Sequence, residues 1–406
     1  MLNWAQRFNI FCFLDSCNYT TSPHRYQCIL AAGSASSISS NTHSLEDIDS
    51  FIKEGAWTFG HLSYDLKNSI HRLKAAKENK IGFAPFFFFK PQFLLQIKDD
   101  EVFIEAENAT ALFDEIEQQS IKSIQQKPSE ISFQSALSQA QYLDVIRQLQ
   151  QHILRGDCYE INFCQEFFAE KATIDPQAVF QKLMEISPNP FSAFYKMEDQ
   201  YLLCASPERF VAKENGRLIT QPIKGTIKRN LVDSANDQDL KKALFTSAKD
   251  RAENVMIVDL MRNDLSRICT EGSVSVDELF GIYSFPQVHQ MISTISGTLK
   301  KECTFSQIIK ALFPMGSMTG APKQKVMELI DQYEPSSRGI FSGSVGYINP
   351  AGDFDFNVVI RSIMYNQSSK YLSYQVGSGI TFYSDPQLEW EECNLKAEAI
   401  KKVLAF

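Results

Sequence analysis

The chain has 406 residues, of which 44% are hydrophobic and 22% are charged, and its formal net charge is −8. This length and composition suit a large globular protein of one big domain or two closely packed ones. The negative charge gives no electrostatic basis for binding nucleic acid or an acidic membrane surface.

The amino terminus and the cysteines predict a cytoplasmic location. The first residues lack the basic and apolar blocks of a signal peptide. The longest apolar run, residues 83–89, contains Pro85 and is too short to span a bilayer. The nine cysteines have no paired spacing, which is typical of free thiols in a reducing compartment.

Residues 1–128 are expected to form an N-terminal α+β region. Within it, residues 57–66 indicate a strand with a glycine break, and residues 83–97 indicate buried strands. Residues 108–128 predict a polar helix and a Lys-Pro-Ser linker, which would mark a boundary. Residues 129–406 would then form a second region that packs with the first as one globular unit.

A helix is predicted to begin at Ser138, because Ser138 and Gln141 make a capping box before apolar residues at helical spacing. Arg155-Gly156 is typical of a helix end. The residues from 156 to 170 alternate like a strand.

Residues 204–226 predict a hairpin, because Asn215-Gly216 lies between two apolar runs. A two-residue turn would place Glu214 opposite Arg217. A three-residue loop would shift the pairing by one residue and change the face of every side chain.

The far end of this hairpin places a lysine near a carboxylate. The two-residue register puts Glu208 opposite Ile223, so Lys224 becomes a neighbour of Glu208. Pro222 cannot donate to a ladder, so the strand should bulge or end there. Gly225 would let a ligand approach the backbone closely. A surface ion pair is the plainer interpretation of this lysine and glutamate.

Two predicted helices carry acidic pairs three residues apart, namely Asp250 with Glu253 and Glu389 with Glu392. This spacing places both members of a pair on one helical face. Such pairs suit Mg²⁺, which prefers oxygen ligands. The alternatives are a solvated acidic first turn and a simple helical ion pair between Glu392 and Lys396.

Glycine-rich turns could hold an anion. Residues 316–320 form a turn before a helix whose first position suits Pro322, and the amides of such a terminus bind anions. Residues 374–380 predict a strand that enters a second glycine-rich turn. Residues 338–363 predict a hairpin that leads to Arg361, whose guanidinium suits a carboxylate. Two further side chains are expected at the anion, Thr319 and Tyr347.

Hairpins interrupted by amphipathic helices predict an α+β fold, with antiparallel sheets packed face to face and helices outside. The residues alone therefore indicate a Mg²⁺-assisted enzyme that acts on a small carboxylate-bearing molecule. Lys224 and Glu208 would supply its covalent and acid–base chemistry.

An ordered series of sequence blocks resembles the chorismate-utilising enzymes. The resemblance covers about residues 138–402, with a fainter part in FGHLSYDL, and rests on GDCYEIN, SPERF, QPIKGT, KDRAENVMIVDLMRNDL, FPQVHQMISTISG, PMGSMTGAPK, GSVGYI, NVVIRS, VGSGI and LEWEEC. It implies a two-sheet sandwich with the active site in the cleft between the sheets, chorismate as substrate and Mg²⁺ as cofactor.

Lys224 in the block PIKGT resembles the aminodeoxychorismate-forming branch, whereas anthranilate synthases usually carry alanine there. The resemblance implies that Lys224 adds to ring carbon 2 of chorismate and that Glu208 protonates the hydroxyl leaving carbon 4. Ammonia then enters at carbon 4 and gives 4-amino-4-deoxychorismate. Because Lys224 must be neutral to attack, we expect burial near Mg²⁺ to lower its pKa.

The resemblance also implies the ligands of the metal and of the substrate. Glu253 and Glu392 would bind Mg²⁺, with Asp250 and Glu389 holding water beside it. The other implied substrate contacts are Arg361, Tyr347, Thr319, Thr226, Gly377, Ser378, Gly379, His289 and Lys396.

Glu160 departs from the family pattern. Ammonia-using relatives often carry glutamine there, and water-using relatives carry a lysine that serves as the base for water. The absence of that lysine argues against the water-using branch. Whether Glu160 deprotonates ammonium, pairs with an arginine or lysine, or merely packs stays open.

The chain contains no glutaminase nucleophile block and no lyase. We therefore expect a separate glutamine amidotransferase subunit and a downstream aminodeoxychorismate lyase. The alternatives are anthranilate synthase component I and a non-catalytic partner that binds an aromatic effector. The segment FLDS, residues 13–16, faintly resembles an effector-binding segment of relatives.

Overall fold

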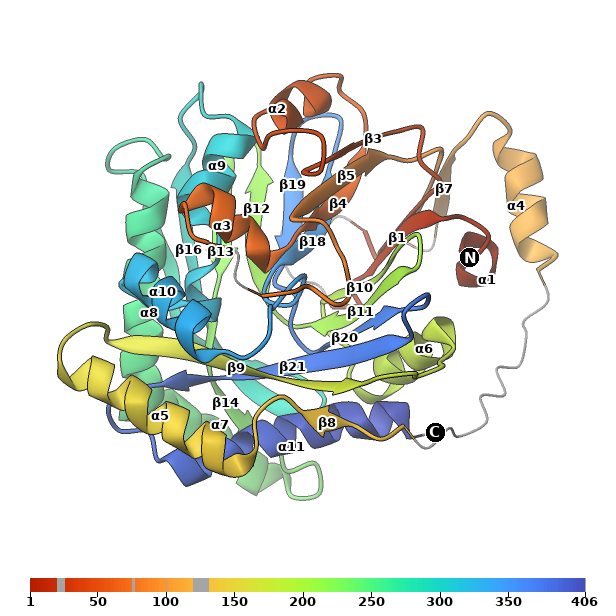
Figure 1. Ribbon diagram of the computed structural model, residues 1–406. Helices are drawn as coiled ribbons and strands as arrows, with labels where there is room; N and C mark the ends of the chain where they lie inside the picture. Colours follow the sequence, from red (N-terminus) through yellow and green to blue (C-terminus); the bar gives the residue numbers. More distant parts are fainter. Residues whose placement is uncertain (20–25, 75–76, 100, 120–130, 406) are drawn as a thin grey trace.

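The computed structural model describes residues 1–19, 26–74, 77–99, 101–119 and 131–405. Two large antiparallel sheets dominate this part of the chain (Figure 1). The first has the strand order β17 (Gly320–Ala321), β9 (Glu160–Ala169), β21 (Tyr371–Ile380), β20 (Ser362–Asn366), β11 (Gln200–Ser206), β10 (Phe191–Met197), β1 (Ile10–Asp15), β2 (Cys28–Ala32), β6 (Phe93–Lys98) and β7 (Glu101–Glu105), with β8 (Gln134–Ser135) beside β9. The second has the order β14 (Ile223–Lys228), β16 (Val288–Thr298), β13 (Arg217–Gln221), β12 (Arg209–Glu214), β19 (Phe354–Asn357), β18 (Ser344–Ile348), β4 (Thr58–Leu62), β5 (Phe86–Lys90) and β3 (Ser36–Ser39), with β15 (Ser275–Ser284) beside β16.

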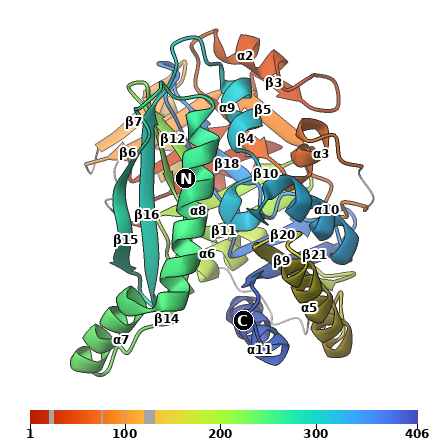
Figure 2. The same cartoon turned by 90° about the vertical axis from the view of Figure 1, so that its left-hand side faces the viewer.

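Helices lie mainly outside the sheets. They are α1 (Leu2–Ala5), α2 (Asp47–Ile52), α3 (Lys67–Ile70), α4 (Ala109–Glu117), α5 (Gln139–Leu154), α6 (Pro176–Ile186), α7 (Ser234–Thr246), α8 (Ala248–Ser266), α9 (Phe305–Leu312), α10 (Lys323–Tyr333) and α11 (Pro386–Leu404), with 3₁₀ turns η1 (Tyr64–Leu66) and η2 (Gly316–Met318). Figure 2 shows α8 along β16, while α5 and α11 lie together beneath β9 and β21. None of the helices in the described residues combines the length and apolar character that a bilayer crossing needs.

The hydrophobic core has two main parts. One contains apolar side chains of both sheets, such as Phe59, Phe356 and Leu202, together with α8 and α9. The other packs the first sheet against α5, α6 and α11, through residues such as Ile146 and Phe194. These layers confirm the predicted α+β fold of two antiparallel sheets. All nine cysteines are free thiols, as expected.

Strands from the first 128 residues enter both sheets, because β1, β2, β6 and β7 lie in the first and β3, β4 and β5 in the second. The predicted strands over residues 83–97 are confirmed by β5 and β6. The strand predicted over residues 57–66 continues through Gly60 and ends at Leu62. The predicted linker around residue 128 lies outside the described residues, so the domain division stays a prediction.

The Asn215-Gly216 hairpin is confirmed. Both residues have positive φ, and Glu214 pairs with Arg217 as a two-residue turn requires. A bulge between Arg209 and Ala212 then shifts the register by one residue, so the predicted pairing of Glu208 with Ile223 is wrong.

The predicted break at Pro222 is confirmed, because β13 ends at Gln221 and β14 begins at Ile223. Strand β14 leaves the hairpin and pairs with β16 instead. Lys224 therefore lies on an edge strand of the second sheet.

Other local predictions have mixed outcomes. The capping box at Ser138 and the helix end at Arg155 are confirmed. Pro322 is the N-cap of α10 and not its first residue. The predicted turn at residues 377–379 is wrong, because β21 runs through these residues in register with β9.

A buried arginine ties the elements beneath the site together. Arg338, which is 3% exposed, binds both carboxylate oxygens of Glu334, at 2.6 and 2.9 Å. It also donates to the carbonyls of Met318 and Asn162, each at 2.7 Å, and lies over the ring of Tyr64. One guanidinium thus joins η2, β9 and the C-cap of α10.

We predict that Arg338→Met lowers the free energy of unfolding by about 3–5 kcal/mol, because it leaves the Glu334 carboxylate buried without its partner. Urea unfolding measures this difference. Arg262→Met, which breaks the exposed pair of Arg262 with Asp259, is the matched control and should cost less than about 1 kcal/mol. Equal effects of the two substitutions would contradict the prediction.

Candidate active site

An ion pair between Lys224 and Glu160 joins the two sheets. Lys224 comes from β14 of the second sheet and Glu160 from the start of β9 in the first. Nζ of Lys224 donates to Oε1 of Glu160, and the two side chains are 11% and 1% exposed. Oε2 of Glu160 is buried without a hydrogen-bond partner among the described residues. Of the roles that the sequence left open for Glu160, the structure shows the pairing with a lysine.

Gly379 leaves the space that this pair occupies. A Cβ atom there would lie 2.7 Å from Oε1 of Glu160 and 3.0 Å from Nζ of Lys224. Any other residue would displace the pair. The glycine is therefore required by this close approach.

The side chains that surround Lys224 do not lower its pKa, and the lowering expected beside Mg²⁺ stays a prediction. Burial pulls the pKa of Lys224 down, but the carboxylates of Glu160, Glu253 and Glu208 outweigh burial and raise it above its ordinary value. The amine therefore has a proton to give up before it can act as a nucleophile.

Glu208 has the properties of a general acid. It is 3% exposed and accepts a 2.6 Å hydrogen bond from Ser317. Burial raises its pKa to about 7, although Ser317, Lys224 and Arg361 each pull it down. A carboxyl group with this pKa carries a proton in a substantial fraction of molecules near neutral pH.

Arg361 lies close enough to Glu208 to influence its charge. Burial lowers the pKa of Arg361 to about 10, with Glu208 and Tyr19 opposing the shift. Its guanidinium has no hydrogen-bond or ion-pair partner among the residues that the structure describes. Its φ of 49° is a left-handed conformation that is uncommon for a non-glycine residue. A partly buried and unpaired guanidinium fits a carboxylate ligand.

The two acidic pairs approach the same lysines from different helices. The carboxylates of Glu253 on α8 and Glu392 on α11 both interact electrostatically with Lys224 and Lys249. Asp250 packs against Gly225, whose φ is +95°, with 3.0 Å between the Asp250 Cβ and the position of a Gly225 Cβ. The structure thus brings α8, β14 and α11 around one space.

The carboxylate of Glu253 has an oxygen that is suited to bind a cation. Oε1 of Glu253 is buried without a hydrogen-bond partner in the described part of the chain, and burial raises the pKa of this carboxyl to about 7. The described residues contain no group of three or more His, Cys, Asp or Glu side chains placed to hold a metal by themselves. This arrangement is compatible with Mg²⁺, which commonly takes one or two protein carboxylates and completes its shell with water and substrate.

The expected ion pair between Glu392 and Lys396 is present at 2.7 Å. Lys396 also donates to the carbonyl of Gly377 at 2.8 Å. The backbone C=O and N–H of Gly377 therefore point away from β9. In an antiparallel strand the N–H of Gly377, and those of alternate residues such as Gly379, point the same way. Strand β20 pairs with β21 only as far as Tyr374, so these amides lie beyond the paired segment. They remain candidates for anion binding, although they belong to a strand and not to a turn.

Glu389 and Ser378 lie on the side of β21 that faces the helices. Glu389 is 6% exposed, and burial raises its pKa while Ser384 and Ser378 oppose the shift. The side chain of Ser378 points opposite to the Cβ direction of Gly379, because strand residues alternate. The structure therefore places these two residues behind the strand that carries Gly379.

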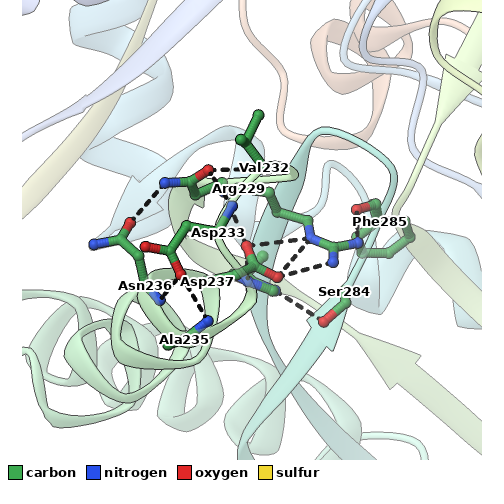
Figure 3. A network of polar contacts seen from close by, with 10 residues as sticks. Arg229, Val232, Asp233, Ala235, Asn236, Asp237, Ser284 and Phe285 are labelled. Carbon is green, nitrogen blue, oxygen red and sulfur yellow. Dashed lines mark hydrogen bonds and ion pairs between the residues drawn. The ribbon is translucent and has the colours of Figure 1, made fainter.

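His289 belongs to a different network, in which Arg229, Asp237 and Ser284 are labelled in Figure 3. Nε2 of His289 lies 3.1 Å from Asp237 and its Nδ1 2.8 Å from Ser284. Arg229 binds the same carboxylate, and this contact lowers the pKa of Asp237 to about 2. The network fastens the start of α7 to β16, and the substrate contact expected of His289 stays a prediction.

Three other expected contacts have neighbours of their own. Tyr347 packs against the rings of Trp57 and Phe59 and lines a small pocket of about 50 Å³ beside Asp15. The hydroxyl of Thr319 donates to the Met315 carbonyl at 3.1 Å. Thr226 is exposed and accepts a long hydrogen bond of 3.5 Å from Gln290.

Comparison with known proteins identifies the family. The family model described as chorismate binding enzyme matches residues 12–402. The chain belongs to the chorismate binding enzyme family.

Two members of this family illustrate the relationship. Aminodeoxychorismate synthase component 1 of Escherichia coli (strain K12) is 42% identical over 272 residues, which are 67% of this chain and 59% of that protein. The protein of the same name from Bacillus subtilis (strain 168) is 30% identical over 361 residues, or 85% of this chain and 76% of that protein. The chain thus spans about three fifths of the Escherichia coli relative.

A solved structure has the same fold as this chain. Anthranilate synthase component I from Streptococcus pneumoniae TIGR4 superposes with a TM-score of 0.82 at 24% identity, covering 94% of this chain and 93% of that one. At this identity the likeness supports the shared fold alone.

Sequence reasoning missed Ser317, Lys249 and Arg338. Ser317 lies in the turn already selected for its glycines, so its hydroxyl was a possible signal. Lys249 directly precedes Asp250, and a cation beside two acidic pairs could have drawn attention. Nothing local distinguishes Arg338, because its partners come from distant segments.

The raised pKa of Glu208 predicts a pH-dependent stability. Below pH 4.5, its ordinary value, both the folded and the unfolded chain keep the proton, so the group makes no difference. Between 4.5 and about 7 the unfolded chain loses the proton and the folded chain retains it, so the carboxyl destabilises the fold as the pH rises. Glu208→Gln should therefore raise the free energy of unfolding by about 3 kcal/mol above pH 7 and by little near pH 4.

Urea unfolding of Glu208→Gln and of the unaltered protein at several pH values measures this difference. Glu271→Gln, at an exposed glutamate, is the control and should leave the pH dependence unchanged. A constant difference across the pH range would refute the assigned pKa shift.

Proposed function

We propose that this protein aminates chorismate to 4-amino-4-deoxychorismate through a covalent intermediate on Lys224. The observation that carries the proposal is the position of Lys224, an amine that lies nearly buried beside Glu160 and in the field of Glu208. The names of the relatives described above agree with this activity. A solvated surface ion pair, the plainer interpretation of this lysine, does not explain its burial.

In the first half of the reaction, Glu160 accepts a proton from the Lys224 ammonium, and the free amine attacks ring carbon 2 of chorismate. The two ring double bonds shift, and the bond between carbon 4 and its hydroxyl breaks. Glu208 gives its proton to this hydroxyl, which leaves as water. The amine remains attached to carbon 2.

In the second half, ammonia attacks carbon 4, the double bonds shift back and the bond between carbon 2 and Lys224 breaks. Glu160 returns the proton to the departing lysine. Glu208, now a carboxylate, accepts the extra proton of the new amine. The sum converts chorismate and ammonia into 4-amino-4-deoxychorismate and water.

The occupied carbon 2 determines where nitrogen is added. While Lys224 is attached there, ammonia can react only at the other end of the conjugated system. Arg361 and the amides of Gly377 and Gly379 are suited to bind the enolpyruvyl carboxylate. Glu253 and Glu392, with Asp250 and Glu389 nearby, would hold Mg²⁺, which when bound offsets the charge of the ring carboxylate.

We further propose that ammonia comes from a separate glutamine amidotransferase subunit and that a lyase converts the product to 4-aminobenzoate. The words "component 1" in the names of relatives support a partner subunit. The competing activity is that of anthranilate synthase. Lys224 disfavours it, because an amine on carbon 2 blocks the position where that reaction adds nitrogen.

Lys224→Ala tests the covalent step. We expect loss of aminodeoxychorismate formation, by a factor of at least about 100, because no amine can occupy carbon 2. The measurement is a coupled assay with chorismate, Mg²⁺ and ammonium, in which added lyase converts the product to 4-aminobenzoate. Lys228→Ala, at an exposed lysine of the same strand, is the control. Unchanged rate and product would refute the covalent role, and anthranilate made by the unaltered protein without lyase would refute the proposed activity.

Gly379→Ala tests the geometry of the pair. The added Cβ would displace Glu160 and Lys224, and a shift of this size can reduce turnover about 100-fold. The fold should lose less than about 1 kcal/mol, because flexible side-chain ends can move. Turnover and thermal unfolding are measured together. Full activity in a folded variant would show that the position of the pair is unimportant.

A further inference from the structure

A cavity of about 400 Å³ lies where the loop at residues 77–81 meets β9, β21 and the segment that follows α10. Its lining includes neither Lys224 nor Glu160 nor Glu208. It also shares no residue with the small pocket beside Asp15. The cavity is therefore separate from the candidate active site and from that pocket.

A half-buried cation on one wall of the cavity lacks a counter-charge. Nζ of Lys77 makes a long hydrogen bond of 3.4 Å to a main-chain carbonyl of α10, and no ion pair with a described residue. The nearby carboxylate of Glu334 binds Arg338 instead. The other nearby carboxylate, that of Asp331, binds Lys67. Burial accordingly lowers the pKa of Lys77, and an anion in the cavity would supply the missing charge.

A carboxylate on the β9 wall likewise lacks a cation. Glu166 accepts a 3.1 Å hydrogen bond from the hydroxyl of Tyr371 but makes no ion pair with a described residue. The ammonium of Lys80 lies over the ring of Tyr371, and its ion pair is with the exposed Glu170 at 4.0 Å. Burial raises the pKa of Glu166, while Ser336 and Tyr371 oppose the shift. The cavity thus has a cation and an anion on different walls.

Two polar side chains of β21 are buried beneath the cavity, Ser373 at 1% and Gln375 at 5% exposure. Oγ of Ser373 has no hydrogen-bond partner among the described residues. Nε2 of Gln375 donates to the carbonyls of Ser337 and Arg338, at 3.1 and 3.4 Å, which leaves its Oε1 as an acceptor. A buried polar atom without a partner is energetically costly, so this floor suits a ligand that brings N–H donors.

We propose that this cavity binds a free α-amino acid, whose carboxylate contacts Lys77 and whose ammonium contacts Glu166 and the polar floor. A zwitterion compensates both walls at once, whereas an anion alone would face Glu166 and a cation alone would face Lys77. The volume lies in the range of small-molecule sites, so it also admits a side chain. This inference goes beyond the proposed amination of chorismate and does not rest on it.

Isothermal titration calorimetry of the unaltered protein with each of the twenty L-amino acids tests the inference. At least one should bind with a Kd below about 1 mM. Its N-acetyl derivative lacks the ammonium and its carboxamide lacks the carboxylate, so each should bind at least about tenfold more weakly. Binding of none of the twenty would overturn the inference, and so would equal binding of either derivative.

Lys77→Met and Glu166→Gln each remove one of the two charges and should weaken binding of the same amino acid at least about tenfold. The matched controls are Lys98→Met and Glu170→Gln, which remove exposed charges outside the cavity and should leave the Kd unchanged. If every amino acid that binds does so equally well after both cavity substitutions, the ligand lies elsewhere and the inference is wrong. The two derivatives test the same charges on the unaltered protein, even where a substitution prevents folding.

Discussion

The arrangement of the site depends on the ion pair between Lys224 and Glu160, because this contact joins the two sheets. Each sheet has a local feature that makes the contact possible. Strand β14 can present Lys224 there because the chain leaves the hairpin at Pro222 and pairs with β16. Strand β21 can lie close because Gly379 has no side chain. A lysine and a glutamate 64 residues apart in the chain thereby become one functional unit.

Burial and charge act against each other throughout this site. Burial raises the pKa values of Glu208 and Glu253 to about 7, whereas the pKa of Lys224 is raised because three carboxylates outweigh its burial. The balance favours protons on the amine and on the acids together. An anionic substrate held by Arg361 and a cation held by Glu253 would change that balance in opposite directions, so binding and protonation are coupled.

Local rules predicted local structure well. The turn at Asn215-Gly216, the capping box at Ser138 and the acidic pairs on two helices follow from interactions within a few residues, and each is present. The α+β class also followed from the sequence of strands and helices. The strand order could not be derived, because it depends on pairings between segments far apart in the chain.

The turn predicted at residues 377–379 is wrong for the same physical reason. Residues 377–379 seemed suited to a turn because of their glycines, but pairing with β9 keeps them extended. Tyr347 and His289 have partners from distant segments that no spacing rule reveals. The side chains around Lys224 raise its pKa, and Glu160, for which pairing with a lysine was one of the possibilities, has the strongest charge effect.

The mixing of early and late strands in both sheets constrains how the protein is made. Strand β1 pairs with β10, and β4 pairs with β18, so segments synthesised first wait for partners synthesised much later. Such non-local pairing is slow and leaves apolar strand edges uncovered in the meantime. The nascent chain on the ribosome therefore cannot complete either sheet until the carboxy-terminal strands emerge.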